Sequence, residues 1–335
     1  MTNTTRRISL AGSALVLALV LLFSLGAAAQ NLTRVTIQID GAAVPYYTPL
    51  YIAQELGFFA EEGLDVEFIY GAAADIVRNV AVQNVEFGFP NADSVIAARA
   101  TGIPVKVVHT TLQHGLGATI FKADNGINEP RDLKGKTVAI TSYGSPNYIQ
   151  LQVLLKNAGL SLDDVNLRIV GTGAIVNALV TDQVDAIVFS MLRTFELRHA
   201  GVDVSEWRSD DFLPSFGNVV VTSDAYAQRN PEIVRAFVRG LNKGLQYLID
   251  GNVRAALDVV IPAYTPSYEG SEDYLTDVLN QVYAGYLWQS EDTAANGLGW
   301  GNLDRWNESI RVQREYGIIE GSLDAAEFVT NEFLN

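Results

Sequence analysis

The sequence contains no cysteine and only three histidines, His109, His114 and His199. Without thiols, disulfides and thiolate chemistry are excluded. The histidines do not stand at metal-binding spacing, and the chain has neither an HExxH motif nor a Gly-x-Ser-x-Gly elbow. Catalysis by a pair of carboxylates is not testable at this point, because one sequence does not show which acids face each other. We therefore expect no metal, no cofactor and no enzymatic activity.

Positive charge is also scarce. Lysine and arginine number 23 against 38 aspartates and glutamates, which gives a net charge of −15. Nucleic acids and anionic lipids should repel such a chain, so we expect no nucleic-acid partner. The segment "LKGKT" (133–137) lacks the leading glycine of a phosphate loop and enters a strand, which argues against a nucleotide site.

One apolar run has about the length of a bilayer, and it lies at the N-terminus. "MTNTTRR" is followed by "ISLAGSALVLALVLLFSLG" and then by the small residues of "AAAQ". This order predicts a signal peptide over residues 1–29, cleaved after Ala29; a retained membrane anchor is the alternative. We expect an exported protein, in the periplasm or on the outer face of the cell membrane. Its mature chain would lose Arg6 and Arg7 and carry a charge of −17.

Strand and helix patterns alternate along the first two thirds of the chain. Alternating or buried apolar runs predict strands at 33–40, 65–70, 85–89 and 104–112, with helices between them. The first helix should begin at Thr48 as a cap, followed by Pro49, and stop at Gly57. This order predicts a parallel α/β fold. After residue 226 the pattern is almost wholly helical.

A second α/β run begins near residue 117 and resembles the first. Ile76-Val77, Val80-Ala81 and Val85-Glu86 recur as Ile175-Val176, Leu179-Val180 and Val184-Asp185, each 99 residues later. Any two strand–helix–strand units share some of this pattern, but the constant spacing favours two similar lobes.

Polar and aromatic residues gather directly after the predicted strands. In an open α/β sheet, ligands bind beyond the carboxyl ends of the strands, beside helix N-termini that carry free N–H groups. The residues that we expect to bind a ligand are Tyr46, Tyr47, Thr48, Gly71, Phe89, Asn91, Ser94, His114, Tyr143, Gly144, Ser145, Asn147, Tyr148, Thr172, Ser190 and Asn218.

Three segments carry a family resemblance. "PLYIAQELGFFAEEGLDVEF", "VEFGFPNADSVIAARATGIPVKVV" and "DLKGKTVAITSYGSPNYIQLQVLLKNAGL" resemble the solute-binding subunits of ABC importers, which have the type II periplasmic-binding-protein fold. The similarity covers about residues 33–245. It is greatest to the branch of sulfonate and taurine binders, thiamine-pyrimidine-precursor (ThiY-like) binders and riboflavin (RibY-like) binders.

The resemblance implies a two-lobed clamp whose chain crosses between lobes twice, near 116–118 and 216–219. Lobe 1 would comprise 30–117 and 218–335, with the helical tail packed on it, and lobe 2 would comprise 118–217. A monomer would close on its ligand by a hinge and deliver it to an ABC permease, with the ATPase on a separate subunit.

The ligand is less determined than the family. The loops 41–48, 71–74, 90–94 and 141–148 contain tyrosine, with Phe89 directly before the third loop, but no lysine or arginine. Aromatic rings suit a flat uncharged heterocycle, so we expect riboflavin first and a thiamine pyrimidine precursor second. The alternatives are a sulfonate, taurine or nitrate binder, a pyrimidine-precursor enzyme that uses His114, and a sensory or structural clamp.

Overall fold

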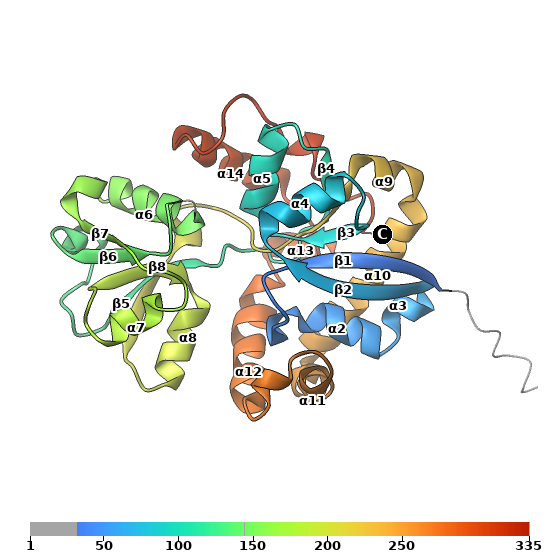
Figure 1. The fold of residues 1–335 in the computed structure, drawn as a ribbon, viewed down its shortest axis with the longest axis horizontal. Coiled ribbons are helices and arrows are strands. Elements are labelled where there is room, and N and C mark those ends of the chain that lie inside the picture. Colours follow the sequence, from blue (N-terminus) through green and yellow to red (C-terminus); the bar gives the residue numbers. More distant parts are fainter. Residues whose placement is uncertain (1–31, 144, 335) are drawn as a thin grey trace, which may run out of the picture.

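The computed structural model describes residues 32–143 and 145–334. The predicted signal peptide and Gly144 lie outside this described part. Two five-stranded sheets form two lobes, which lie side by side in Figure 1. The strand orders are β2-β1-β3-β10-β4 in lobe 1 and β7-β6-β8-β5-β9 in lobe 2. The predicted two-lobed α/β fold is therefore confirmed.

Lobe 1 combines early strands with one late strand. Its strands are β1 (Thr33–Asp40), β2 (Leu64–Gly71), β3 (Phe87–Phe89), β4 (Val105–His109) and β10 (Val220–Ser223), and its early helices are α2 (Thr48–Glu55), α3 (Phe58–Glu61), α4 (Ala73–Ala81) and α5 (Ala92–Ala100). β1 is parallel to β2 and β3, whereas β10 lies antiparallel between β3 and β4. The chain thus leaves this lobe after β4 and returns in β10.

Lobe 2 is built from the continuous stretch between those strands. It contains β5 (Gly117–Lys122), β6 (Thr137–Ile140), α6 (Pro146–Asn157), β7 (Asn166–Ile169), α7 (Ile175–Val180), β8 (Ala186–Ser190), α8 (Leu192–His199) and β9 (Val204–Arg208). The sequence reasoning missed β9, an edge strand paired only with β5. Its residues after Val204 are partly exposed, so "VSEWR" has no clear buried face.

The internal repeat is confirmed by matching backbone geometry. Among the described residues, Gln83 (φ 61°) and Asp182 (φ 57°) are the non-glycine residues with positive φ, and they stand 99 positions apart. Each lies in the turn that leads into β3 or β8. The acids that follow also match, because Glu86 accepts the N–H of Thr36 at 2.8 Å and Asp185 accepts that of Thr137 at 2.7 Å.

The first helix begins at Thr48 and ends before Gly57, as predicted. α2 ends before Gly57, whose φ of 76° is the left-handed conformation expected after a helix. The predicted cap is wrong, however. Thr48 is fully buried inside the helix, and its hydroxyl donates to the carbonyl of Pro45 in the preceding 3-10 turn η1 (Pro45–Tyr47).

The helical tail packs on lobe 1, as predicted. It comprises α9 (Asp224–Arg229), α10 (Pro231–Tyr247), α11 (Val253–Tyr264), α12 (Glu272–Val278), the π-helix η7 (Leu279–Leu287), α13 (Glu291–Asn296) and α14 (Leu303–Glu315). Phe237 of α10 stacks on Phe59 at 5.1 Å and on Phe87 at 4.2 Å. At Gly244 a Cβ would lie 2.4 Å from the carbonyl oxygen of Pro49, so only glycine permits this approach of α10 to α2.

The tail also contacts lobe 2, and two of these contacts join helices of the two parts. His199 of α8 lies 4.6 Å from Tyr274 of α12, measured between ring centroids. On the other side, Val312 of α14 clusters with Val153 of α6 and Leu213. The lobes are therefore joined by helix contacts as well as by the chain crossings.

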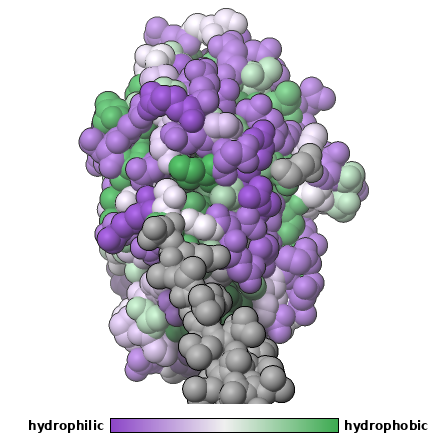
Figure 2. Space-filling model, turned by 90° about the vertical axis from the view of Figure 1, so that its right-hand side faces the viewer, coloured by the Kyte–Doolittle hydropathy of each residue, from purple (hydrophilic) through white to green (hydrophobic). Residues whose placement is uncertain are grey.

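The outer end of lobe 1 in Figure 2 is mostly hydrophilic, with only scattered hydrophobic residues in view. Within the described part of the chain, no helix combines the length and the apolar character needed to cross a membrane.

Candidate ligand pocket

A cavity of ≈ 120 Å³ lies where the early loops of lobe 1 meet the chain crossings. Its walls come from the turn before α2, the end of β3, the two crossings, the tail, and one residue of α8 in lobe 2. The lining residues are Val44, Tyr46, Tyr47, Pro49, Leu50, Phe89, Thr111, Leu112, Leu116, Leu192, Asn218, Leu241, Tyr283 and Trp288. The cavity is thus concave, mostly apolar and rich in aromatic side chains, as ligand pockets are.

The aromatic residues form two small groups. Tyr46 stacks on Tyr283 with ring centroids 5.4 Å apart, and Tyr283 lies 5.5 Å from Trp288. Tyr47 meets Phe89 edge to face at 5.9 Å. Flat rings held in fixed orientations favour stacking with a planar ligand, and they lose little side-chain entropy when they bind it.

Burial further disfavours ionisation of these tyrosines. It is the largest cause that raises the pKa of Tyr46, Tyr47 and Tyr283 above the ordinary value for tyrosine. The hydroxyl of Tyr47 donates to the carbonyl of Asp40 at 2.6 Å. The lining set includes no lysine, arginine, aspartate or glutamate. The walls therefore offer apolar surface and a few neutral polar groups.

The two crossing segments form one side of the cavity. The first crossing segment (110–116) supplies Thr111, Leu112 and Leu116, and the second (209–219) supplies Asn218. The segments are hydrogen-bonded to each other, since the N–H of Leu112 donates to the carbonyl of Asn218 at 3.0 Å. A molecule in the cavity would thus touch both segments that connect the lobes.

The predicted residues of lobe 1 come together around this cavity. Tyr46, Tyr47, Phe89 and Asn218 line it. Asn91 forms a bridge with Asn218, and its side chain caps α5 by accepting the N–H of Ser94 at 2.9 Å. Asn91, Ser94 and two further predicted residues, Thr48 and Gly71, do not line it. Thr48 is buried in α2, and Gly71 ends β2, where a Cβ would meet Gln38 at 2.5 Å.

The predicted residues of lobe 2 that the structure describes do not line the cavity. Tyr143 is 64% exposed and meets Tyr148 edge to face at 5.2 Å. Ser190 accepts the N–H of Leu192 at 3.3 Å, and Thr172 is exposed. Ser145 and Asn147 stand at the start of α6.

His114 is held elsewhere. Its Nδ1 lies 2.8 Å from a carboxylate oxygen of Asp210, and its ring stacks on Tyr286 at 4.1 Å. The strand predicted over 104–112 ends at His109, so His114 belongs to the first crossing segment. No cluster of His, Cys, Asp or Glu suited to a metal occurs in the described ranges.

Sequence reasoning missed the contributions of the tail and of α8. Tyr283 and Trp288 flank the cavity, and both belong to the aromatic segment "VYAGYLW" (282–288). That cluster of three aromatic residues was the available signal. Nothing in the sequence distinguished Leu192, which reaches the cavity only because lobe 2 faces lobe 1.

A family model described as NMT1/THI5 like matches residues 44–255, which include η1, α2 and all of lobe 2. The chain belongs to the NMT1/THI5-like family. A relative named riboflavin-binding protein RibY, from Chloroflexus aurantiacus, is 29% identical over 311 residues, covering 92% of this chain and 88% of the relative. A formylaminopyrimidine-binding protein from Halalkalibacterium halodurans is also 29% identical, over 84% of each chain.

Another relative of this NMT1/THI5-like protein carries an enzyme name. It is a 4-amino-5-hydroxymethyl-2-methylpyrimidine phosphate synthase from Legionella pneumophila, 26% identical over 90% of this chain and 92% of the relative. Among solved structures, a sulfonate-binding protein SsuA from Methylobacillus flagellatus has a TM-score of 0.70 at 18% identity and covers 91% of this chain and 93% of its own. This likeness shows the periplasmic-binding-protein fold.

Proposed function

We propose that this protein is the extracytoplasmic solute-binding subunit of an ABC importer and captures a flat heterocyclic vitamin or vitamin precursor. Riboflavin is the first choice and a thiamine pyrimidine precursor the second. The observation that carries the proposal is the uncharged aromatic cavity at the chain crossings. The names of the two binding relatives support the same chemistry.

The proposed mechanism is capture followed by closure. The ring system stacks on Tyr46 and Tyr283, while Leu192 of α8 covers it from lobe 2. A ligand that touches both lobes stabilises the closed arrangement more than the open one, so binding shifts the population. In this proposal lobe 1 spans 30–117 and 218–335, and the loop around Tyr143 and Tyr148 of lobe 2 (118–217) approaches the ligand on closure. A permease with a separate ATPase subunit then receives it from the monomer.

The size of the cavity bears on the choice of ligand. Pockets that enclose drug-sized ligands measure about 300–1,000 Å³. A cavity of ≈ 120 Å³ accommodates a single pyrimidine ring more readily than three fused rings. Riboflavin therefore requires the space to widen between the lobes, whereas a pyrimidine precursor does not. The cavity volume is therefore the reason to retain the pyrimidine precursor as the second candidate.

Binding without turnover fits the position of His114 better than catalysis does. The histidine is paired with Asp210 and stacked on Tyr286, and it does not line the cavity. An anionic ligand such as a sulfonate fits less well, because no basic side chain lines the walls to compensate its charge.

Spectroscopy on the purified protein tests this proposal directly. A copurifying flavin would show in the absorption spectrum, and titration with riboflavin should quench flavin fluorescence to a one-to-one end point. Formylaminopyrimidine and taurine serve as comparison ligands in thermal-shift assays. Stabilisation by formylaminopyrimidine alone would select the second candidate. Release of a chemically altered product would overturn the binding role, and stabilisation by taurine alone would overturn the aromatic ligand class.

A further inference from the structure

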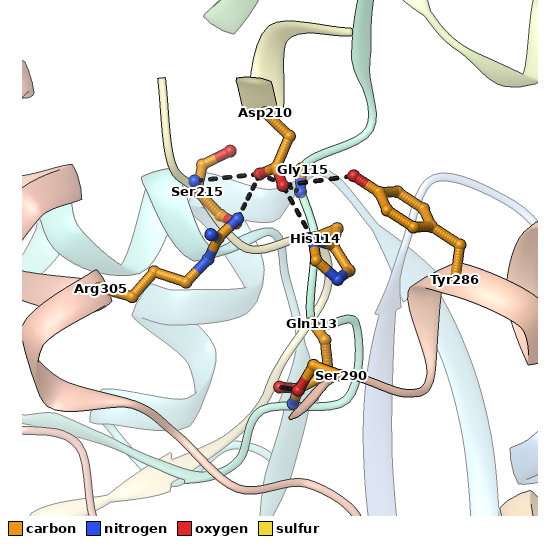
Figure 3. A network of polar contacts seen from close by, with 8 residues as sticks. All are labelled: Gln113, His114, Gly115, Asp210, Ser215, Tyr286, Ser290 and Arg305. Carbon is orange, nitrogen blue, oxygen red and sulfur yellow. Dashed lines mark hydrogen bonds and ion pairs between the residues drawn. The ribbon is translucent and has the colours of Figure 1, made fainter. Parts of the chain in front are cut away.

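The buried carboxylate of Asp210 joins the two crossing segments (Figure 3). Asp210 lies in the second crossing segment and is 9% exposed. Its Oδ1 accepts the backbone N–H of Gly115 at 3.0 Å and that of Ser215 at 3.3 Å. Gly115 belongs to the first crossing segment and Ser215 to the second. One side chain therefore ties both segments together at the point where the chain passes between lobes.

The same carboxylate also binds the helical tail. Arg305 of α14 forms an ion pair with Asp210 and donates to the carbonyl of Ser215 at 2.9 Å. Tyr286 of η7 donates its hydroxyl to Oδ2 at 3.3 Å, and His114 lies 2.8 Å from that oxygen. Figure 3 shows these groups converging on Asp210 from separate parts of the chain.

The charges of this cluster balance locally. Burial is the largest influence and by itself would raise the pKa of Asp210. The hydrogen bond from His114 and the charge of Arg305 oppose it, so that the pKa lies below the ordinary value for aspartate. Asp210 is thus a carboxylate at neutral pH, and its removal would leave Arg305 without its partner.

The π-helix η7 connects this cluster to the ligand pocket. Tyr283 of η7 lines the cavity, and Tyr286, one turn further on, contacts Asp210 and His114. Arg208, at the end of β9, lies 4.6 Å from the centre of the Tyr286 ring. If a ligand on Tyr283 shifted η7, Tyr286 would move with it and change the contacts of Asp210 with both crossing segments.

We propose that Asp210 is a hinge clamp that positions both crossing segments against the tail and so links pocket occupancy to the arrangement of the lobes. The link between pocket occupancy and lobe arrangement rests on the proposed function. The effect of Asp210 on the ligand-free protein does not. A residue that merely stabilises the fold would change the melting temperature without changing the distance between lobes.

Two introduced cysteines make that distance measurable, because the natural chain has none. Val82→Cys in lobe 1 and Ile169→Cys in lobe 2 replace side chains that are 68% and 46% exposed. Labelled with a fluorophore pair, this protein reports the interlobe distance distribution with and without riboflavin. Asp210→Asn is introduced on this background. The matched control is Asp224→Asn, which removes a comparable ion pair with Arg99 (2.9 Å) wholly within lobe 1.

The clamp predicts that Asp210→Asn broadens the interlobe distribution of the free protein and weakens riboflavin binding about tenfold. Asp224→Asn should leave both quantities unchanged. Tyr286→Phe keeps the ring contacts but loses the hydroxyl, so it should produce a smaller shift in the same direction, and it replaces Asp210→Asn if that variant does not fold.

Folded variants at Asp210 and Tyr286 with the wild-type distribution would overturn the clamp. Failure of wild-type protein to bind riboflavin would instead reject the proposed ligand. In that case the interlobe distance distributions of the ligand-free variants would still test whether Asp210 is a hinge clamp.

Discussion

The two lobes share a repeated scaffold but contribute unequally to the pocket. In both, a helix ends in a turn with one residue at positive φ, and an acid then binds the backbone of a neighbouring strand. Lobe 1 adds Tyr46, Tyr47 and Phe89 to the cavity, whereas lobe 2 adds only Leu192. The scaffold thus holds the strands in register, and the loops and tail that are not repeated make the site.

The lobes also differ in how their cores are completed. The core of lobe 1 includes Phe237 from the tail, packed on Phe59 and Phe87. That of lobe 2 uses residues of its own continuous segment, such as Phe121, whose ring centroid lies 4.5 Å from that of Trp207. Lobe 1 therefore depends on a segment more than a hundred residues away from its first strands, whereas the core cluster around Phe121 lies entirely within residues 121–212.

The largest effect should come from Phe237→Ala. Deleting this fully buried ring should cost about 3–5 kcal/mol and loosen the tail from lobe 1. Phe121→Ala is the matched change in lobe 2. Urea unfolding followed by circular dichroism measures the loss of stability in each variant. Fluorescence titration of the folded proteins should then show that Phe237→Ala alone impairs riboflavin binding. Equal losses of riboflavin binding in both variants would contradict the claim that the pocket depends on the core of lobe 1 more than on that of lobe 2.

The next effect depends on pH and on His109, a buried residue of lobe 1. Burial lowers its pKa to about 4, and its Nε2 donates to Asn242 at 2.8 Å. In the unfolded chain the pKa is about 6.5, so the unfolded state binds the extra proton first as the pH falls. Because of His109, the free energy of unfolding should therefore fall by up to about 3 kcal/mol as the pH is lowered from 6.5 to 4.

Comparison with the wild-type protein isolates this effect. His109→Gln should flatten the dependence of unfolding free energy on pH in that window. Urea titrations at pH 4, 5, 6 and 7 provide the measurement. The same slope in His109→Gln as in the wild type would contradict the assignment.

The paired acids of the repeat provide a test of equivalence. Glu86→Gln and Asp185→Asn each weaken one charge-assisted hydrogen bond to a strand N–H, so each should cost about 1.5 kcal/mol. Thermal unfolding of the two variants should give shifts that agree within about a factor of two. A large cost for one and none for the other would show that the repeat has diverged energetically.

The smallest expected effect separates pocket tyrosines from surface tyrosines. Tyr46→Ala and Tyr283→Ala each remove one ring of the stacked pair and should weaken riboflavin binding about tenfold, or about 1.4 kcal/mol. Tyr143→Ala removes a ring that is 64% exposed and should weaken binding less. Fluorescence titration measures all three. A larger loss in Tyr143→Ala would mean that closure brings lobe 2 into the site more fully than lobe 1.

Much of this architecture could be predicted from sequence, because local signals agreed with the fold. The first strand, the helix that ends before Gly57 and the repeat of Val85-Glu86 at Val184-Asp185 all follow from periodicity and turn residues. The missed features depend on tertiary context. Strand β9 has no clear buried face. Thr48 failed as a cap because a 3-10 turn precedes it and takes its hydroxyl.

The candidate site was predictable only in part, for the same reason. Tyr46 and Tyr47 follow β1 and Phe89 ends β3, at the sheet edge where ligands bind in this kind of fold. Tyr283 and Trp288 come from a tail whose packing no local pattern specifies. The hydrogen bond of His114 with Asp210 joins residues 96 positions apart, so no local pattern in the sequence could indicate it.

Small-angle X-ray scattering with and without saturating riboflavin tests the central claim most directly. If the cavity lies between lobes that close on a ligand, the radius of gyration should fall when riboflavin binds. It should stay at the ligand-free value in a Tyr46→Ala, Tyr283→Ala double variant that no longer binds. Bound riboflavin with an unchanged radius of gyration would contradict the account, because the two lobes would then behave as one rigid body.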